Sequence, residues 1–136
     1  MTNLKQLFYI SRITEGVDER AIRGILSISR RNNRMLDVTG SLCFTGCHFA
    51  QVLEGREDAI AELTRRIYAD PRHADFRLLI DRTTTLREHP MWSMAYLHNL
   101  ELAGDIQALF AAPEPSMRKT LQTMTRLKPD TVMGAL

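Results

Sequence analysis

The stretch HFAQVLEG, residues 48–55, follows a turn at residues 45–47 and is predicted to form a β-strand. Side chains alternate across a strand, so Phe49, Gln51 and Leu53 share one face. A carboxamide therefore stands in an otherwise apolar row. A buried amide left without partners costs roughly 1–3 kcal/mol, so Gln51 needs hydrogen-bonding groups on that face.

Two other predicted strands carry polar or polarisable side chains as well. An early strand over residues 4–12 carries Tyr9, and a late strand over residues 91–97 carries Trp92 and Met94. A phenol, an amide, an indole and a thioether, brought together by three strands, fit a flat polar ligand better than they fit a plain hydrophobic core.

The order of the predicted elements is that of the split βαβ, or ferredoxin-like, α+β fold. We expect a five-stranded mixed sheet with two helices on one face. The predicted elements are strands over residues 4–12, 38–44, 48–55, 76–81 and 91–97, a helix from the N-cap Asp18 to Asn33, a helix from Glu57 to Asp70, and a polar loop over residues 83–90.

The last part of the chain is predicted to cover the other face of the sheet. Leu102, Ile106 and Leu109 mark one short helix. Ser116 is a credible N-cap for a second, which carries Met117, Leu121 and Met124 at positions i, i+4 and i+7.

Composition describes an ordinary globular domain and excludes several functions. The 136 residues are 44% apolar and 25% charged, and the net charge of +2 is too small to indicate nucleic-acid binding. No apolar run reaches the ~20 residues of a membrane span, and no signal pattern precedes the first strand, so we expect a cytoplasmic protein. Cys43 and Cys47 are expected to be reduced thiols.

No set of side chains indicates catalysis or metal binding. The four histidines have no partners at the spacing of an acid–base pair or a zinc site; they are His48, His73, His89 and His98. The residues therefore favour a binding protein over an enzyme.

The two predicted helices border a candidate cleft. Asn32 and Asn33 end the first helix on its sheet-facing side, where they either terminate the helix or grip the edge of a heterocycle. The nearby arginines, including Arg31, either are stabilised by the negative end of the helix dipole or bind phosphate. On the second helix, Arg66 and Asp70 either form an exposed pair or line the cleft.

Several short motifs, in this order, resemble the BLUF family of blue-light sensors that use FAD. The resemblance spans about Leu4 to Leu97 and is closest to the short, stand-alone bacterial members of the BlrB type. The motifs are Tyr9 with Ser11, SRRNN at 29–33, VTGSL at 38–42, FAQVLEG at 49–55, DPRH at 70–73 and WSM at 92–94.

The resemblance implies a flavin-binding domain over residues 1–98 and a helical extension over residues 99–136 that packs on the sheet in the same unit. FAD, with FMN or riboflavin as alternatives, would lie between the two helices. Ile25 would pack on the ring, and Asn32 and Asn33 would meet its polar edge. The implied flavin-binding residues are Tyr9, Ser11, Ile25, Ser29, Arg31, Asn32, Asn33, Gln51, Leu53, Arg66, Asp70 and His73.

The resemblance also implies a light-driven switch without enzymatic turnover. Tyr9 would give up an electron and a proton, Gln51 would rearrange, and the flavin absorption would shift to the red. Trp92 and Met94 would pass the change to the C-terminal helices and to a downstream protein partner, with homodimerisation also open. Which of these two residues faces the flavin in the dark stays open. The competing interpretation is a cofactor-free ferredoxin-like module that binds protein or RNA.

Overall fold

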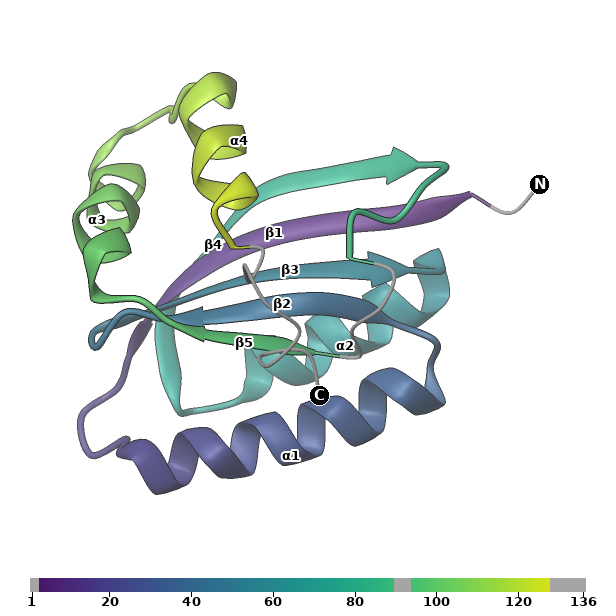
Figure 1. Ribbon diagram of the computed structural model, residues 1–136, viewed down its shortest axis with the longest axis horizontal. Helices are drawn as coiled ribbons and strands as arrows, with labels where there is room; N and C mark the ends of the chain where they lie inside the picture. The colour runs from purple at the N-terminus through teal and green to yellow at the C-terminus, as the bar shows by residue number, and fades with distance from the viewer. Residues whose placement is uncertain (1–2, 90–93, 128–136) are drawn as a thin grey trace.

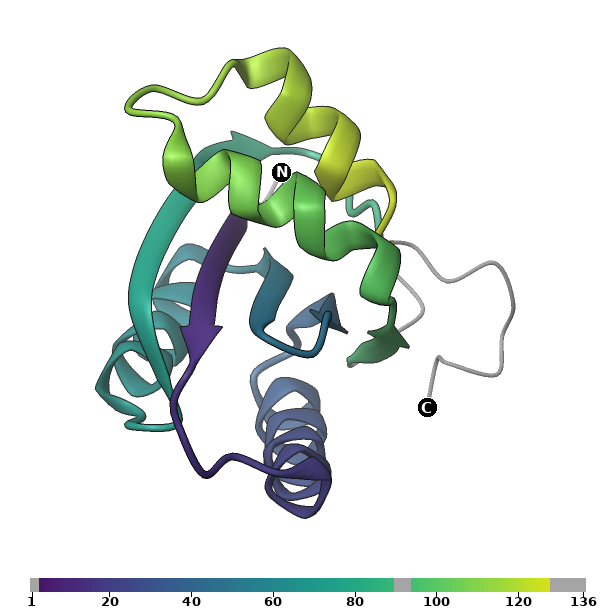
Figure 2. The same ribbon diagram turned by 90° about the vertical axis from the view of Figure 1, so that its left-hand side faces the viewer.

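The computed structural model describes residues 3–89 and 94–127, which form three layers with one sheet in the middle (Figure 1). Helices α1 and α2 cover one face of the sheet, and α3 and α4 lie against the other (Figure 2). The helices are α1 (Glu19–Met35), α2 (Glu57–Ala69), α3 (Ala103–Ala111) and α4 (Met117–Thr125), with a 3-10 turn at Leu100–Leu102 before α3.

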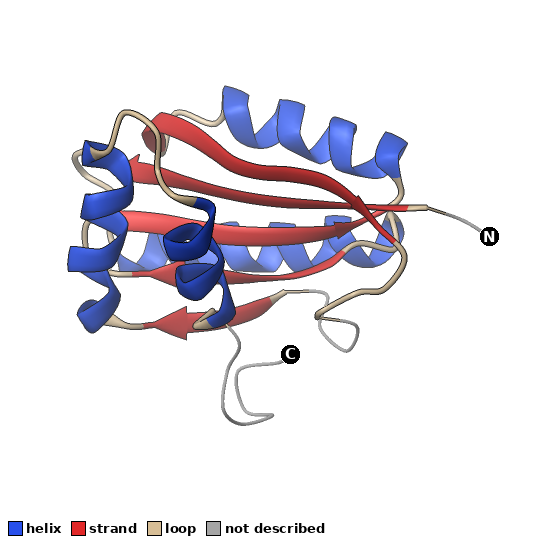
Figure 3. Ribbon diagram, turned by 90° about the horizontal axis from the view of Figure 1, so that it is seen from above, coloured by secondary structure: helices blue, strands red, loops and turns tan. Residues whose placement is uncertain are grey.

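The sheet has the strand order β4-β1-β3-β2-β5 (Figure 3). All neighbouring strands are antiparallel except β2 and β5, which are parallel. This arrangement confirms the ferredoxin-like α+β fold with a fifth strand added at one edge. The strands are β1 (Leu4–Ile13), β2 (Thr39–Phe44), β3 (His48–Gly55), β4 (His73–Thr84) and β5 (Ala95–His98).

Strand alternation divides the core into two clusters, one on each face of the sheet. Leu7, Tyr9 and Leu53 belong to the cluster under α1 and α2. Phe8 and Val52 point the other way, into a cluster completed by the C-terminal side chains Leu102, Ile106, Leu109, Met124 and Leu127. In the β1–β3 register Tyr9 lies directly opposite Gln51, so both side chains face α1 and α2.

Two predicted helix caps are confirmed. The Asp18 carboxylate accepts a hydrogen bond from the Ala21 backbone N–H at 2.9 Å, and the Ser116 hydroxyl accepts one from the Lys119 N–H at 3.1 Å. Each cap satisfies a backbone donor that the first turn of a helix leaves without an internal partner.

Strand β4 is longer than the prediction of residues 76–81. It pairs with β1 from His73 to Thr84, so the last two residues belong to the strand and not to the loop. As an edge strand it exposes polar side chains such as Asp81, which hides the apolar alternation at its ends.

The predicted strand over residues 91–97 differs from β5, which begins at Ala95. Met94 therefore precedes the strand, and Trp92 lies outside the described residues. In α4 the predicted apolar stripe is only partly buried, because Met117 is 58% exposed while Met124 is buried. Among residues 3–89 and 94–127, no helix has the length and apolar character that a membrane span requires.

Candidate functional site

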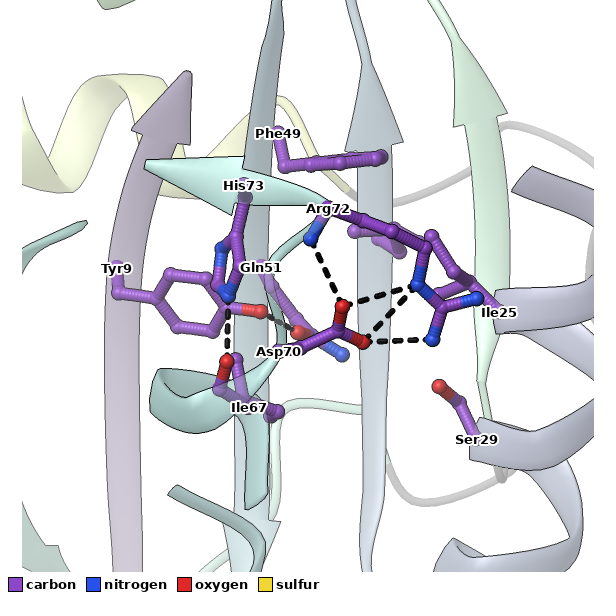
Figure 4. Close-up of a pocket in the computed structure, with 10 residues that line it drawn as sticks. Tyr9, Ile25, Ser29, Phe49, Gln51, Ile67, Asp70, Arg72 and His73 are labelled. Carbon is purple, nitrogen blue, oxygen red and sulfur yellow. Dashed lines mark hydrogen bonds and ion pairs between the residues drawn. The ribbon is translucent and has the colours of Figure 1, made fainter. Parts of the chain in front are cut away.

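A pocket opens between the sheet, α1 and the C-terminal end of α2 (Figure 4). Strands β1, β2 and β3 contribute Tyr9, Leu42, Phe49 and Gln51 to its lining. The helical and loop side is lined by Ile25 and Ser29 from α1 and by Ile67, Asp70, Arg72 and His73 at and after the end of α2.

The pocket-lining residues Tyr9 and Gln51 form a continuous hydrogen-bonded chain with the buried Met94. The Tyr9 hydroxyl donates to Oε1 of Gln51, and Nε2 of Gln51 donates to the Met94 sulfur at 3.5 Å. The Met94 carbonyl in turn accepts from Nε of Arg30 at 3.1 Å. The chain therefore joins the central strands β1 and β3 to the start of β5 and to α1.

Tyr9 is held as a neutral phenol. Its ring stacks on Phe76 with a centroid distance of 4.6 Å, and its side chain is buried. Burial raises the pKa of Tyr9 well above its ordinary value, and the negative charge of Asp70 raises the pKa further. The hydroxyl thus keeps its proton at any physiological pH.

His73 fixes one wall of the pocket. Its Nε2 lies 2.5 Å from the Ile67 carbonyl oxygen, and its Nδ1 lies 2.9 Å from the Ser11 hydroxyl. A carbonyl oxygen can only accept, so Nε2 donates the bond to Ile67, while Nδ1 shares a hydrogen bond with the Ser11 hydroxyl. This pair of bonds ties β4 both to the end of α2 and to β1.

An ion pair stands at the pocket rim. Asp70 accepts from the Arg72 side chain through Nε at 2.9 Å and Nη2 at 2.6 Å, and from the Arg72 backbone N–H at 2.9 Å. The Arg72 guanidinium holds the pKa of Asp70 below its ordinary value. Arg66 does not join this pair, since it bonds Glu62 on α2 at 2.9 Å.

The remaining sequence-predicted residues of α1 do not line the pocket, and neither does Leu53. Asn33 is buried and Asn32 is half-buried at the end of α1, whereas Arg31 is exposed. Leu53 is buried in the core under the helices, next to the pocket strands.

Four lining residues were not predicted from the sequence. Phe49 and Leu42 could have been found, because Phe49 shares the Gln51 face of β3 and Leu42 is paired with Gln51 in the sheet. Ile67 lies on the apolar stripe of α2 with Ile60 and Leu63, which indicates an inward side chain but not a pocket. Arg72 belongs to the DPRH motif, but it lies in a turn, where no periodicity shows which way its side chain points.

The residues present fit a flat, polar aromatic ligand such as flavin. Apolar walls from Ile25, Leu42 and Phe49 surround the Gln51 amide, which is only 4% exposed. The amide nitrogen carries two hydrogens, and the contact with Met94 uses one. No partner for the other is found among residues 3–89 and 94–127, so this donor is available to a ligand with ring acceptors.

A buried carboxylate anchors the segment that leads to Met94. Glu54, at the end of β3, accepts from Nε2 of Gln6 at 2.9 Å and from the backbone N–H groups of Glu88 and His89 at 2.9 and 2.7 Å. The His89 ring also lies against it. Burial raises the pKa of Glu54, but the hydrogen bonds outweigh burial and leave the pKa below its ordinary value.

Replacing Glu54 by glutamine is expected to destabilise the protein by about 2–3 kcal/mol at pH 7, because the amide would bring a donor against existing donors. Since the folded-state pKa of Glu54 is depressed, its contribution is present above ~4.3, the unfolded value, and is lost as the pH falls through the folded value. Urea unfolding should be measured from pH 7 to pH 3.5. The difference between wild type and variant in the free energy of unfolding should become smaller below pH 4. The exposed Glu101→Gln should show no such pattern, and a pH-independent difference would contradict the assignment.

The family model described as "BLUF: Sensors of blue-light using FAD" matches residues 4–95, which include strands β1 to β4 and the two helices α1 and α2 and end at the first residue of β5. The chain belongs to the BLUF family. A solved structure of BlrB, a BLUF protein in its dark state, has 33% sequence identity and a TM-score of 0.76, and the match covers 93% of this chain and 98% of that one.

Two curated relatives contain a BLUF region within longer proteins. The blue light- and temperature-regulated antirepressor BluF of Escherichia coli (strain K12) is 43% identical over 70 residues, which is 52% of this chain and 17% of that protein. Photoactivated adenylate cyclase subunit beta of Euglena gracilis is 28% identical over 141 residues, which is 99% of this chain and 16% of that protein. This BLUF chain therefore spans about a sixth of the length of these relatives.

Proposed function

We propose that this BLUF protein is a blue-light photoreceptor that holds FAD in the pocket between α1 and α2 and signals without enzymatic turnover. The observation that carries the proposal is the Tyr9–Gln51–Met94 chain, which runs through the pocket from one strand to the next. The flavin supplies the absorption of blue light and, once excited, an acceptor for an electron.

The proposed roles in holding the flavin follow from position for the residues that line the pocket and from family resemblance for the others. Ile25 and Phe49 would pack against its ring, and Gln51 would bond its polar edge together with Asn32 and Asn33. The polar lining residues Ser29, Asp70 and Arg72 would meet the ribityl chain and phosphates. Arg31 and Arg66 do not line the pocket, and their proposed phosphate contacts rest on family resemblance alone.

Tyr9 is the proposed donor of an electron and a proton. Its raised pKa keeps the proton on the phenol oxygen in the dark, so loss of the proton is tied to loss of an electron. Oε1 of Gln51 already accepts the hydrogen bond of this hydroxyl and offers a path for the proton.

Gln51 is the proposed switch. If its amide turns over, Nε2 faces Tyr9, whose hydroxyl oxygen can accept a hydrogen bond as readily as it donates one. The amide oxygen then faces the Met94 sulfur, which has no hydrogen to donate, so the contact that now holds Met94 is lost. The two amide orientations therefore differ in their interaction with Met94, and this difference is what a signal requires.

Output is proposed to leave through the residues attached to Met94. Strand β5 follows it directly, and Arg30 links its carbonyl to α1. Because the relative BluF is an antirepressor, we propose a downstream protein partner in the cytoplasm. An RNA-binding sheet is disfavoured, since the face away from the pocket is packed against α3 and α4.

The proposal is tested by loading the purified full chain with FAD, FMN or riboflavin. We expect saturable binding near one flavin per chain, measured as quenching of flavin fluorescence. This binding should be lost when Ser29→Trp fills the pocket. The matched variant Ser27→Trp, on the exposed side of the same helix, should bind normally. Failure of all three flavins to bind would overturn the proposed function.

A further inference from the structure

The outward side of α1 carries a row of arginines. At 100° per residue, Arg20, Arg23, Arg31 and Arg34 fall on one side of the helix, and the small residues Gly24 and Ser27 lie between the two pairs. All six are exposed, while Ile22, Leu26 and Asn33 are buried on the opposite side. We call these six residues the arginine face. In Figure 1 no described element lies on the side of α1 that faces away from the sheet.

Positive charge is concentrated on this helix. Helix α1 contains five arginines and one glutamate, a net charge of +4, whereas the whole chain has a net charge of +2. The rest of the chain is therefore negative by 2. Arginines elsewhere mostly have carboxylate partners, as Arg72 and Arg126 do. Within residues 3–89 and 94–127, Arg20, Arg31 and Arg34 have no ion pair, and Arg23 reaches Glu19 only at 4.0 Å.

Helix electrostatics do not account for this row. Cations near a helix C-terminus are stabilised by its dipole, which suits Arg31 and Arg34. Arg20 lies in the first turn, where the same dipole disfavours positive charge, and Arg23 lies one turn after Glu19, beyond the reach of the dipole. The dipole therefore favours only the C-terminal pair of the row.

Two exposed apolar side chains flank the arginines and indicate the kind of partner. Ile28 is 47% exposed and Met35 is 79% exposed, and on the helix both fall beside Gly24 and Arg31. A phosphate backbone gains nothing from isoleucine or methionine, whereas protein interfaces are enriched in arginine and methionine. The combination favours an acidic protein surface with apolar side chains over a nucleic acid.

We propose that the arginine face, together with Ile28 and Met35, docks an acidic amphipathic helix of a partner protein. Acidic side chains of the partner would meet the two arginine pairs, and its apolar side chains would cover Ile28 and Met35 where Gly24 and Ser27 allow close approach. The buried side of α1 lines the pocket and Arg30 bonds the Met94 carbonyl, so the docking site and the pocket share one helix. Docking itself needs no photochemistry and can be tested in darkness.

The test uses a labelled synthetic peptide, 20 residues long, with leucine at helical spacing and glutamate on the flanks, titrated against the full chain by fluorescence anisotropy. We expect Arg20→Glu with Arg34→Glu to weaken binding by roughly tenfold or more, with Arg31 left unchanged because it is also a proposed flavin-binding residue. The control pair Arg118→Glu with Lys119→Glu makes the same change in net charge on α4, where both residues are exposed, and should leave binding nearly unchanged. Ile28→Ser should weaken binding severalfold at unchanged charge.

Other outcomes overturn the proposal. An equal loss of peptide affinity in the two double charge-reversal variants would mean that only net charge attracts the peptide. Tight binding of a 20-base-pair DNA duplex that is insensitive to Ile28→Ser would assign the arginine face to nucleic acid instead. No measurable peptide binding would overturn the proposed docking. This holds whether or not the same preparation binds flavin and responds to light.

Discussion

Replacing Gln51 by leucine is expected to abolish the light-induced red shift while leaving flavin bound. Leucine fills a similar volume against Phe49 and Leu42, so the pocket keeps its walls. It has no donor or acceptor, so the bond from Tyr9 and the bond to Met94 are lost together. The measurement is the visible absorption spectrum of the flavin-loaded variant before and just after blue light.

Gln107→Leu is the matched control for this substitution. Gln107 lies on α3 and its amide oxygen bonds His48 on the other side of the sheet, away from the pocket. The flavin absorption of that variant should shift to the red as in wild type. A normal shift in Gln51→Leu would remove Gln51 from the mechanism and leave the pocket assignment intact.

Replacing Gly40 by alanine is expected to destabilise the protein by about 3 kcal/mol or more, a large part of the roughly 5–15 kcal/mol that stabilises a typical domain. A Cβ at Gly40 in β2 would come within 2.0 Å of the Val52 carbonyl oxygen in β3. This neighbour is backbone in the centre of the sheet and cannot move aside without breaking the β2–β3 pairing. Urea unfolding of the soluble variant, or its failure to accumulate as folded protein, measures the effect.

Gly24→Ala tests whether the effect at Gly40 is steric. A Cβ at Gly24 meets nothing within 4 Å, and alanine favours a helix interior by up to ~1 kcal/mol over glycine. That variant should be as stable as wild type or more stable. A Gly40→Ala protein of wild-type stability would mean that β2 and β3 are not this close.

The fold was predictable because local patterns set it. Period-two alternation placed Tyr9 and Gln51 on strands, helical spacing placed Ile106 and Leu109 on one helix, and Asp18 marked the start of another. The structure confirms each of these. Strand β4 was predicted too short because polar side chains at an exposed edge conceal the pairing that continues beneath them.

The site was predictable only in part. Periodicity reports which side chains are buried but not which distant segment they meet, so the Gln6–Glu54 bond across 48 residues carried no local signal. The turn that brings the Arg72 side chain back onto Asp70 could not be predicted from periodicity either. The flavin roles of Asn32 and Asn33 rest on family resemblance and stay predictions, as do those of Arg31 and Arg66.

The central claim is that blue light changes the hydrogen bonding of a flavin through Tyr9 and Gln51. The most direct test is the absorption spectrum of the FAD-loaded full chain in the dark, just after blue light, and during recovery in darkness. The account predicts a bound flavin band that moves to the red and returns without bleaching. A bound flavin whose spectrum does not change on illumination would contradict it.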